Sequence, residues 1–135
     1  MPDDINTKEL GDQETKRPVT QKRRKLPERL RFVIRETGGV LEVPATHSII
    51  VGRKTNTQFV DVDLTDFQAV ELGVSRQHVE IMPRTDEQLL IIKDLDAVNG
   101  SFINKQPMVP GQLYELEDGD VLKLGLMHVT VEFVD

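Results

Sequence analysis

Three short polar clusters in the sequence carry side chains that could do chemistry, and each flanks a run of strand-forming residues. They are Gly52-Arg53-Lys54, Ser75-Arg76-Gln77-His78, and Asn99-Gly100-Ser101 with Asn104. An arginine offers a planar set of donors that matches the oxygens of a phosphate, and a serine hydroxyl can donate one more hydrogen bond. The clusters supply donors but no obvious proton acceptor. They therefore predict binding of an anion without its hydrolysis.

The same residues give little support for catalysis or for a metal site. His78 follows Ser75 by three positions, which could suggest a nucleophile and its base, but no Gly-x-Ser-x-Gly elbow surrounds the serine. Asp61-x-Asp63 resembles the start of a calcium loop, yet the required later glycine and glutamate are missing. The histidines are scattered and cysteine is absent. We therefore expect no enzymatic activity, no metal and no cofactor.

The segments that must position these clusters have the pattern of short β-strands. Leu30, Phe32 and Ile34 alternate with residues that would face the other way, which is the period of a half-buried strand. Similar strand-forming runs follow at 40–43, 48–51, 79–82, 89–93, 101–103, 121–124 and 129–134. The best helical candidate is the short stretch 66–72, which Gly73 could end. Many short strand-forming runs without a sustained helical pattern predict an all-β sandwich or barrel. In such a fold the functional residues usually lie in the loops at one end.

The charge of the chain changes sign along its length. Residues 1–15 carry −4, residues 16–31 carry +7 and residues 32–135 carry −9, for a net −6. Residues 1–28 have few apolar side chains, no aromatic residue and no regular period, so they predict a disordered tail ahead of a domain over 29–135. An acidic body is a poor general binder of nucleic acid, and we expect no specific nucleic-acid partner. The basic segment, residues 16–31, is interpreted as a solvated linker, with docking on an acidic surface, a membrane or a nucleic acid as the alternative.

Taken together, the three clusters resemble the forkhead-associated (FHA) domain family. That family has Gly-Arg, then Ser-Arg-x-His, then Asn-Gly-Thr/Ser-x-x-Asn, and the matching positions here are 52–53, 75–78 and 99–104. Asp94-Leu95 and the Leu-Glu-Asp-Gly-Asp run at 116–120, followed by Leu124-Gly125, extend the resemblance over residues 30–134. The resemblance includes the bacterial single-domain type with an N-terminal tail. It implies an FHA-like β-sandwich of about 10 or 11 mostly antiparallel strands.

The resemblance also implies a phosphothreonine-peptide-binding adapter in Ser/Thr-kinase signalling. Its partner would be a phosphothreonine-containing protein or peptide, such as a kinase or a kinase substrate. Arg53, Ser75 and Arg76 would donate to the phosphate, and Asn99 would pair with the main chain of an extended ligand. The motif positions with a structural role would be Gly52, His78, Gly100 and Asn104, of which the histidine braces the binding loop.

The sequence departs from the family pattern at three places near this site. Val98 stands where the family usually has Ser or Thr, so one hydroxyl is missing, at a cost of about 1 kcal/mol if it bonds the ligand. The valine could still line a niche for the threonine γ-methyl group. Ser101 replaces the commoner Thr. The long loop 54–74 carries acids that would weaken binding of acidic peptides or select basic ones, namely Asp61, Asp63, Asp66 and Glu71.

Two alternative functions remain compatible with these residues. The first is a scaffold with the FHA fold that binds proteins without a phosphate group. Val98 and the acidic loop support this alternative. The second is a switch in which a phosphorylated tail threonine binds back to the chain's own site. The candidate phosphosites for it are Thr7, Thr15 and Thr20.

Targeting signals are absent from the sequence pattern. The first residues lack a basic region followed by an apolar run, and the longest apolar stretch is four residues, 89–92. These features argue against a secretory signal and a transmembrane segment. Together with the absence of cysteine, they lead us to expect a cytoplasmic protein, and we expect it to be a monomer.

Overall fold

A computed structural model describes residues 25–135, and every structural statement below concerns that part of the chain. The candidate phosphosites Thr7, Thr15 and Thr20, and most of the basic segment, lie outside the described residues.

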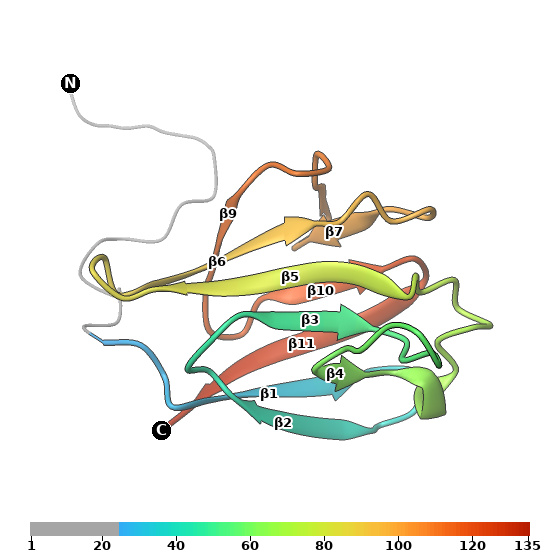
Figure 1. The fold of residues 1–135 in the computed structure, drawn as a ribbon, viewed down its shortest axis with the longest axis horizontal. Coiled ribbons are helices and arrows are strands. Elements are labelled where there is room, and N and C mark those ends of the chain that lie inside the picture. The colour runs from blue at the N-terminus through green and yellow to red at the C-terminus, as the bar shows by residue number, and fades with distance from the viewer. Residues whose placement is uncertain (1–24) are drawn as a thin grey trace.

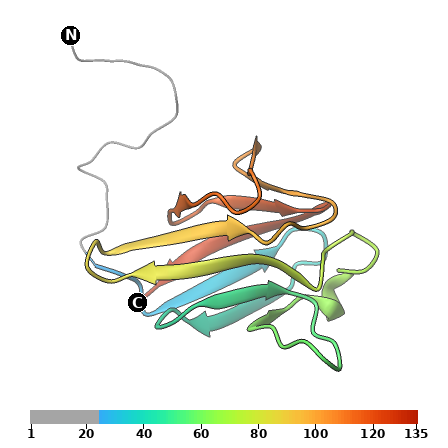
Figure 2. The same cartoon turned by 45° about the horizontal axis from the view of Figure 1, so that its top comes forward.

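The described residues form two β-sheets packed face to face, as Figures 1 and 2 show from two angles. One sheet has six strands in the order β2-β1-β11-β10-β7-β8, and the other has five in the order β4-β3-β5-β6-β9. Among the described strands all neighbours are antiparallel except β3 and β4. The prediction of a mostly antiparallel all-β sandwich is confirmed. The strands are β1 (Arg29–Ile34), β2 (Val40–Pro44), β3 (Ile49–Gly52), β4 (Val62–Asp63), β5 (Gln77–Arg84), β6 (Leu89–Asp94), β7 (Ser101–Ile103), β8 (Gln106–Pro107), β9 (Tyr114–Leu116), β10 (Val121–Leu124) and β11 (Met127–Val134).

The core lies between the two sheets and is built from the alternating residues of the long strands. Leu30, Phe32 and Ile34 of β1 are fully buried, while their neighbours face outward. In the register of β1 with β11, Phe32 lies opposite Val131 and Ile34 opposite Val129, both also buried. Each such side chain contributes about 2 kcal/mol by leaving water. This packing holds the strand ends, and therefore the loops, in a defined arrangement.

The structure differs from the sequence-based prediction at its shortest strands and at the predicted start of the domain. The strands β4, β8 and β9 have two or three residues, too few to show an alternating pattern. Leu26 and Glu28, which the pattern places in the tail, already contact the domain. The Leu26 backbone N–H donates to Gln88 Oε1 at 3.0 Å, and the Glu28 N–H donates to the Val134 carbonyl at 3.1 Å.

The stretch 66–72, the best helical candidate, forms only a single turn of 3₁₀ helix at Thr65–Phe67 followed by further turns. Gly73 ends this stretch with a φ of +78°, a backbone conformation that glycine adopts without strain. None of the helices in residues 25–135 has the length and apolar character needed to cross a membrane.

The loops that carry the polar clusters gather at one end of the sandwich, on the right in Figure 1. They are the β3–β4 loop, the β4–β5 segment and the β6–β7 loop, and the β10–β11 turn lies beside them. Backbone hydrogen bonds join them: the Gly125 N–H donates to the Gly100 carbonyl at 3.1 Å, and the Leu126 N–H donates to the Leu72 carbonyl at 2.8 Å. Segments that are distant in the sequence therefore meet at this end.

Candidate functional site

Arg53 directly follows β3 and is half-buried against the segment that precedes β5. Its backbone N–H donates to the Arg76 carbonyl at 2.9 Å, and its Nε donates to the Val74 carbonyl at 2.7 Å. The Nε bond fixes the plane of the guanidinium group beside residues 74–76. No described residue accepts a hydrogen bond from the two terminal nitrogens, so this face of the guanidinium remains available to an anion.

Ser75 links the second polar cluster to the third. The Val98 backbone N–H donates to Ser75 Oγ at 3.2 Å, across the space between the β4–β5 segment and the β6–β7 loop. Because Oγ acts here as an acceptor, its own hydrogen is left to donate elsewhere. Position 98 makes this bond through its backbone, so it does not depend on the side chain. The valine side chain is 89% exposed.

Asn99 binds the domain's own main chain through its amide nitrogen. Its Nδ2 donates to the Gly73 carbonyl at 3.0 Å. A Cβ added at Gly73 would lie 2.7 Å from that nitrogen, so the contact requires glycine at this position. Sequence reasoning did not include Gly73 in the site, although a glycine two residues before Ser75 was the signal available. Arg76 is exposed, and its carbonyl accepts the Arg53 N–H bond.

His78 is fully buried behind these loops, with both ring nitrogens engaged. Nδ1 accepts the Ser75 backbone N–H at 3.0 Å, so Nε2 carries the hydrogen and donates to the Gly100 carbonyl at 2.9 Å. Burial lowers the pKa of His78, although the bond to Gly100 and the nearby Asp94 charge act in the opposite direction. The neutral imidazole therefore braces two of the loops, and no ring nitrogen is left to take a proton from the Ser75 hydroxyl.

The domain should lose stability as the pH falls below 6.5, the ordinary pKa of histidine, because of His78. In the unfolded chain this histidine takes up a proton near that pH, whereas the folded domain holds it neutral. The unfolded state then binds more protons, so acid favours unfolding. The lowered pKa values of Glu36, Glu42 and Asp63 add to the loss only near 4.5 and below. An NMR titration of the imidazole measures the pKa of His78, and urea unfolding at each pH measures the free energy of unfolding. A His78 pKa at or above 6.5 would contradict the prediction.

A buried carboxylate shapes the β6–β7 loop. Asp94 is 2% exposed; its Oδ1 accepts a hydrogen bond from the Ser101 hydroxyl, and its Oδ2 accepts the Ala97 backbone N–H at 3.1 Å. The buried carboxylate is thereby satisfied by donors on both oxygens. Ser101 supplies the hydroxyl that this bond needs, so the replacement of the commoner Thr keeps the contact.

Asn104 has a structural position away from the loop-end cluster. Its Nδ2 donates to Asp120 Oδ1 and its Oδ1 accepts the Val121 N–H, both at 2.9 Å. Its φ of +47° is one that asparagine tolerates better than most residues. Both partners lie at the start of β10, so Asn104 ties the β7–β8 turn to that strand and does not join Arg53 and Ser75.

The two glycines of the motif are required for different reasons. At Gly52 an added Cβ would lie 2.2 Å from the Arg76 carbonyl oxygen and 2.8 Å from that of Ser75. This close approach lets the Arg53 backbone bond to residue 76. At Gly100 the space is open, but the φ of +77° is unfavourable for a residue with a side chain.

Two of the acids in the long loop hold the loop itself. Asp61 Oδ2 accepts the Ile50 N–H at 2.7 Å. Asp63 Oδ1 accepts the Lys54 N–H and both the N–H and the hydroxyl of Thr65. Burial alone would raise the pKa of Asp63, but the hydrogen bonds from Thr65 and Lys54 bring it below its ordinary value. Within residues 25–135 no group of three or more His, Asp or Glu side chains is placed to hold a metal ion.

The three polar clusters lie within a region that matches a known protein family. The model of the FHA domain matches residues 49–125, which is more than half of the chain and contains all three polar clusters. This chain belongs to the FHA-domain family. The resemblance to the FHA family inferred from the sequence is thereby confirmed.

Individual FHA proteins show how far the similarity extends. The FHA domain-containing protein FhaA of Mycobacterium tuberculosis is 37% identical over 84 residues, which are 62% of this chain but only 14% of FhaA. A solved FHA domain from Arabidopsis thaliana is 28% identical with a TM-score of 0.66, covering 82% of this chain and 88% of that one. A third FHA domain, solved in work on phosphothreonine-dependent interactions, is 30% identical with a TM-score of 0.59, covering 79% and 98%. The chain thus spans a small part of FhaA but nearly the whole of the solved domains.

Proposed function

We propose that this FHA domain is a non-enzymatic adapter that binds phosphothreonine peptides in Ser/Thr-kinase signalling. The observation that carries the proposal is the meeting of Arg53, Ser75 and Asn99 from three different loops. Each is held by an internal hydrogen bond and keeps further hydrogen-bonding capacity. The phosphothreonine-dependent interactions named for one related domain support the same ligand class.

The donors suit a single phosphate group in an otherwise acidic domain. The free terminal nitrogens of the Arg53 guanidinium would bind two phosphate oxygens, and the Ser75 hydroxyl and Arg76 would add further donors. Hydrogen bonds to a charged group contribute about 1.5 to 3 kcal/mol each. Residues 32–135 carry a net charge of −9, so attraction depends on these placed groups and not on a general positive field.

The β6–β7 loop would contact the peptide on either side of the phosphate group. Asn99 uses Nδ2 for Gly73, which leaves its Oδ1 to accept an N–H from an extended peptide. Val98, whose side chain is 89% exposed, would contact the γ-methyl group of the threonine. The partner is then a phosphothreonine-containing protein, such as a kinase or its substrate.

Replacing Val98 with threonine should strengthen phosphopeptide binding about fivefold. The substitution restores a hydroxyl near the ligand, and one added hydrogen bond contributes about 1 kcal/mol. The side chain is exposed, so the fold should tolerate the change. Isothermal titration calorimetry with one phosphothreonine peptide measures the effect, and Val98→Ala is the matched control that removes the methyl groups without adding a hydroxyl. Equal or weaker binding by V98T would contradict this role of position 98.

The proposal is tested by screening the full chain against a degenerate phosphothreonine peptide library, with phosphoserine and unphosphorylated libraries in parallel. We expect selection of phosphothreonine peptides with micromolar affinity, about −8 kcal/mol. Failure to select any phosphothreonine peptide would reject the proposal. Selection that persists after phosphatase treatment would instead support the phosphate-independent scaffold.

A further inference from the structure

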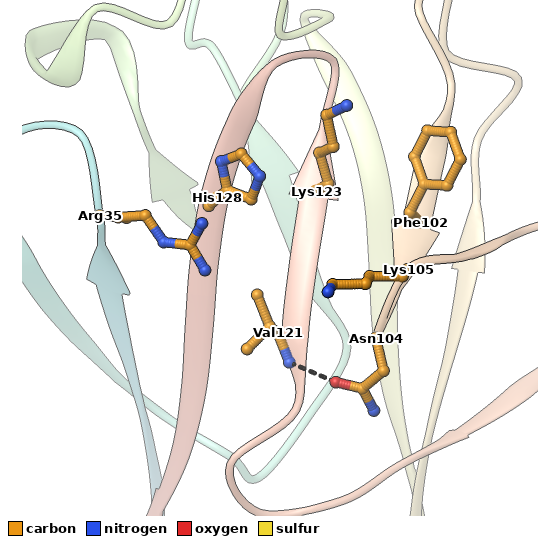
Figure 3. A pocket seen from close by; sticks show the side chains of 7 residues that line it. All are labelled: Arg35, Phe102, Asn104, Lys105, Val121, Lys123 and His128. Atoms are coloured by element: carbon orange, nitrogen blue, oxygen red, sulfur yellow. Dashed lines mark hydrogen bonds between the residues drawn. The ribbon is translucent and has the colours of Figure 1, made fainter. Parts of the chain in front are cut away.

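A second cationic feature lies on the outer face of the six-stranded sheet. A cavity of ≈ 460 Å³ is lined there by Arg35, Phe102, Lys105, Val121, Lys123 and His128, among others (Figure 3). We call it the basic hollow. Phe102, Lys123 and His128 alternate along their strands with buried residues, so their side chains face away from the core. None of Arg53, Ser75 or Asn99 lines it.

Three cations line the basic hollow, namely Arg35, Lys105 and Lys123. Among residues 25–135, no carboxylate is within ion-pair distance of Arg35, Lys105 or Lys123. Other cations of the domain do have such partners; Arg31, for example, contacts both Glu42 and Glu132. The hollow therefore gathers uncompensated positive charge in a domain whose residues 32–135 sum to −9.

The side chains of the basic hollow are arranged around a common space. In Figure 3 the Arg35 guanidinium and the Lys105 Nζ point toward one another from opposite sides. Lys123 Nζ lies 5.2 Å from the centre of the Phe102 ring, within the range of a cation–π contact. Two carboxylates near the hollow already have partners: Glu36 Oε2 lies 2.7 Å from His128 Nδ1, and Asp120 Oδ1 accepts a hydrogen bond from Asn104 Nδ2 at 2.9 Å.

We propose that the basic hollow binds a short acidic segment of a protein partner, with carboxylate side chains seated among Arg35, Lys105 and Lys123. The exposed parts of Phe102 and Val121 would contact the aliphatic portions of those side chains. The three cations of the hollow can pair with the few carboxylates of a short acidic segment. A nucleic acid carries phosphates over a greater length, and those outside the hollow would lie over an acidic surface, so a nucleic-acid partner is disfavoured. This site is separate from the proposed phosphothreonine site and does not depend on it.

An NMR titration of the ¹⁵N-labelled full chain with a hexaglutamate peptide tests the proposal. We expect shifts at Arg35, Phe102, Lys105 and Lys123, which weaken as salt is added. The double variant K105E/K123E should reduce the affinity at these positions by at least about tenfold, since each removed cation costs a charge-assisted contact. The matched control R84E/K93E makes the same change of charge on the other sheet and should leave the affinity unchanged.

Three results would overturn the proposal. Shifts confined to the basic segment, residues 16–31, would show that the peptide binds there and not in the basic hollow. Equal affinity for the double variant and the control would show that charge at the hollow does not matter. Shifts of the hollow residues with a short DNA duplex, but not with hexaglutamate, would assign this surface to nucleic acid.

Discussion

Replacing Arg53 with alanine should lower the affinity for a phosphothreonine peptide by about a hundredfold or more. The guanidinium group of Arg53 is oriented by its Nε bond to the Val74 carbonyl, which leaves the terminal nitrogens for two phosphate oxygens. Two charge-assisted hydrogen bonds together contribute about 3 kcal/mol or more, and 1.4 kcal/mol is a factor of ten. Fluorescence anisotropy with a labelled peptide from the library screen measures the loss.

Control variants separate the phosphate contact from an effect on folding. Arg53→Lys keeps the charge but loses the planar donor set and the bond to Val74, so it should recover only part of the affinity. Arg84→Ala, at the end of β5 that lies away from the loop cluster, should leave the affinity unchanged. Ser75→Ala should weaken binding about tenfold, because it removes one hydroxyl donor. If R53A keeps its fold by NMR and still binds with wild-type affinity, the site does not hold the phosphate, and the phosphate-independent scaffold becomes the better explanation.

Replacing Gly52 with alanine should destabilise the domain by about 3 kcal/mol. The new Cβ would lie 2.2 Å from the Arg76 carbonyl oxygen, a backbone atom that cannot move like a flexible side chain. The register of β3 with β5 shifts between Val51 and Gly52, so the clash falls at an irregularity in the pairing of these two strands. Overpacking of this kind costs about 1 to 3 kcal/mol, and a backbone clash belongs at the upper end. Urea unfolding measures the change in midpoint.

Gly100→Ala is the matched control for G52A. Its site is open, and the substitution meets only the unfavourable left-handed φ, which costs about 1 to 2 kcal/mol. The Gly52 variant should therefore be the less stable of the two. It should also weaken phosphopeptide binding, because relief of the clash would move Arg53 away from residues 74–76. A smaller loss of stability for G52A than for G100A would contradict the packing argument.

The local patterns of the sequence predicted the parts of the fold that local physics controls. The alternation of Leu30, Phe32 and Ile34 predicted β1, because a strand buried on one face places every second residue in the core. The glycines and polar residues between such runs predicted loops. The short strands β4, β8 and β9 were not predicted, because their pairing is set by neighbouring strands and not by their own residues.

In the candidate site, too, the sequence predicted the residue types but not the contacts between loops. The residue types and spacing of Arg53, Ser75 and Asn99 indicated an anion-binding cluster and a family. They did not indicate that the Val98 backbone N–H would reach Ser75 Oγ, or that Asn99 would require glycine at position 73. These contacts join loops more than twenty residues apart, and nothing in either loop alone specifies them.

By itself the sequence determined an all-β domain, the division of charge between a basic segment and an acidic body, and a set of donors suited to a phosphate. Only the tertiary structure decided which of these groups meet. The order β2-β1-β11-β10-β7-β8 places the first long strand beside the last, so Arg35 and Lys123 come to line one hollow although they are distant in the chain. The physical reason is that strand pairing depends on burying both sheets' apolar faces at once, a condition on the whole chain that no short segment can express.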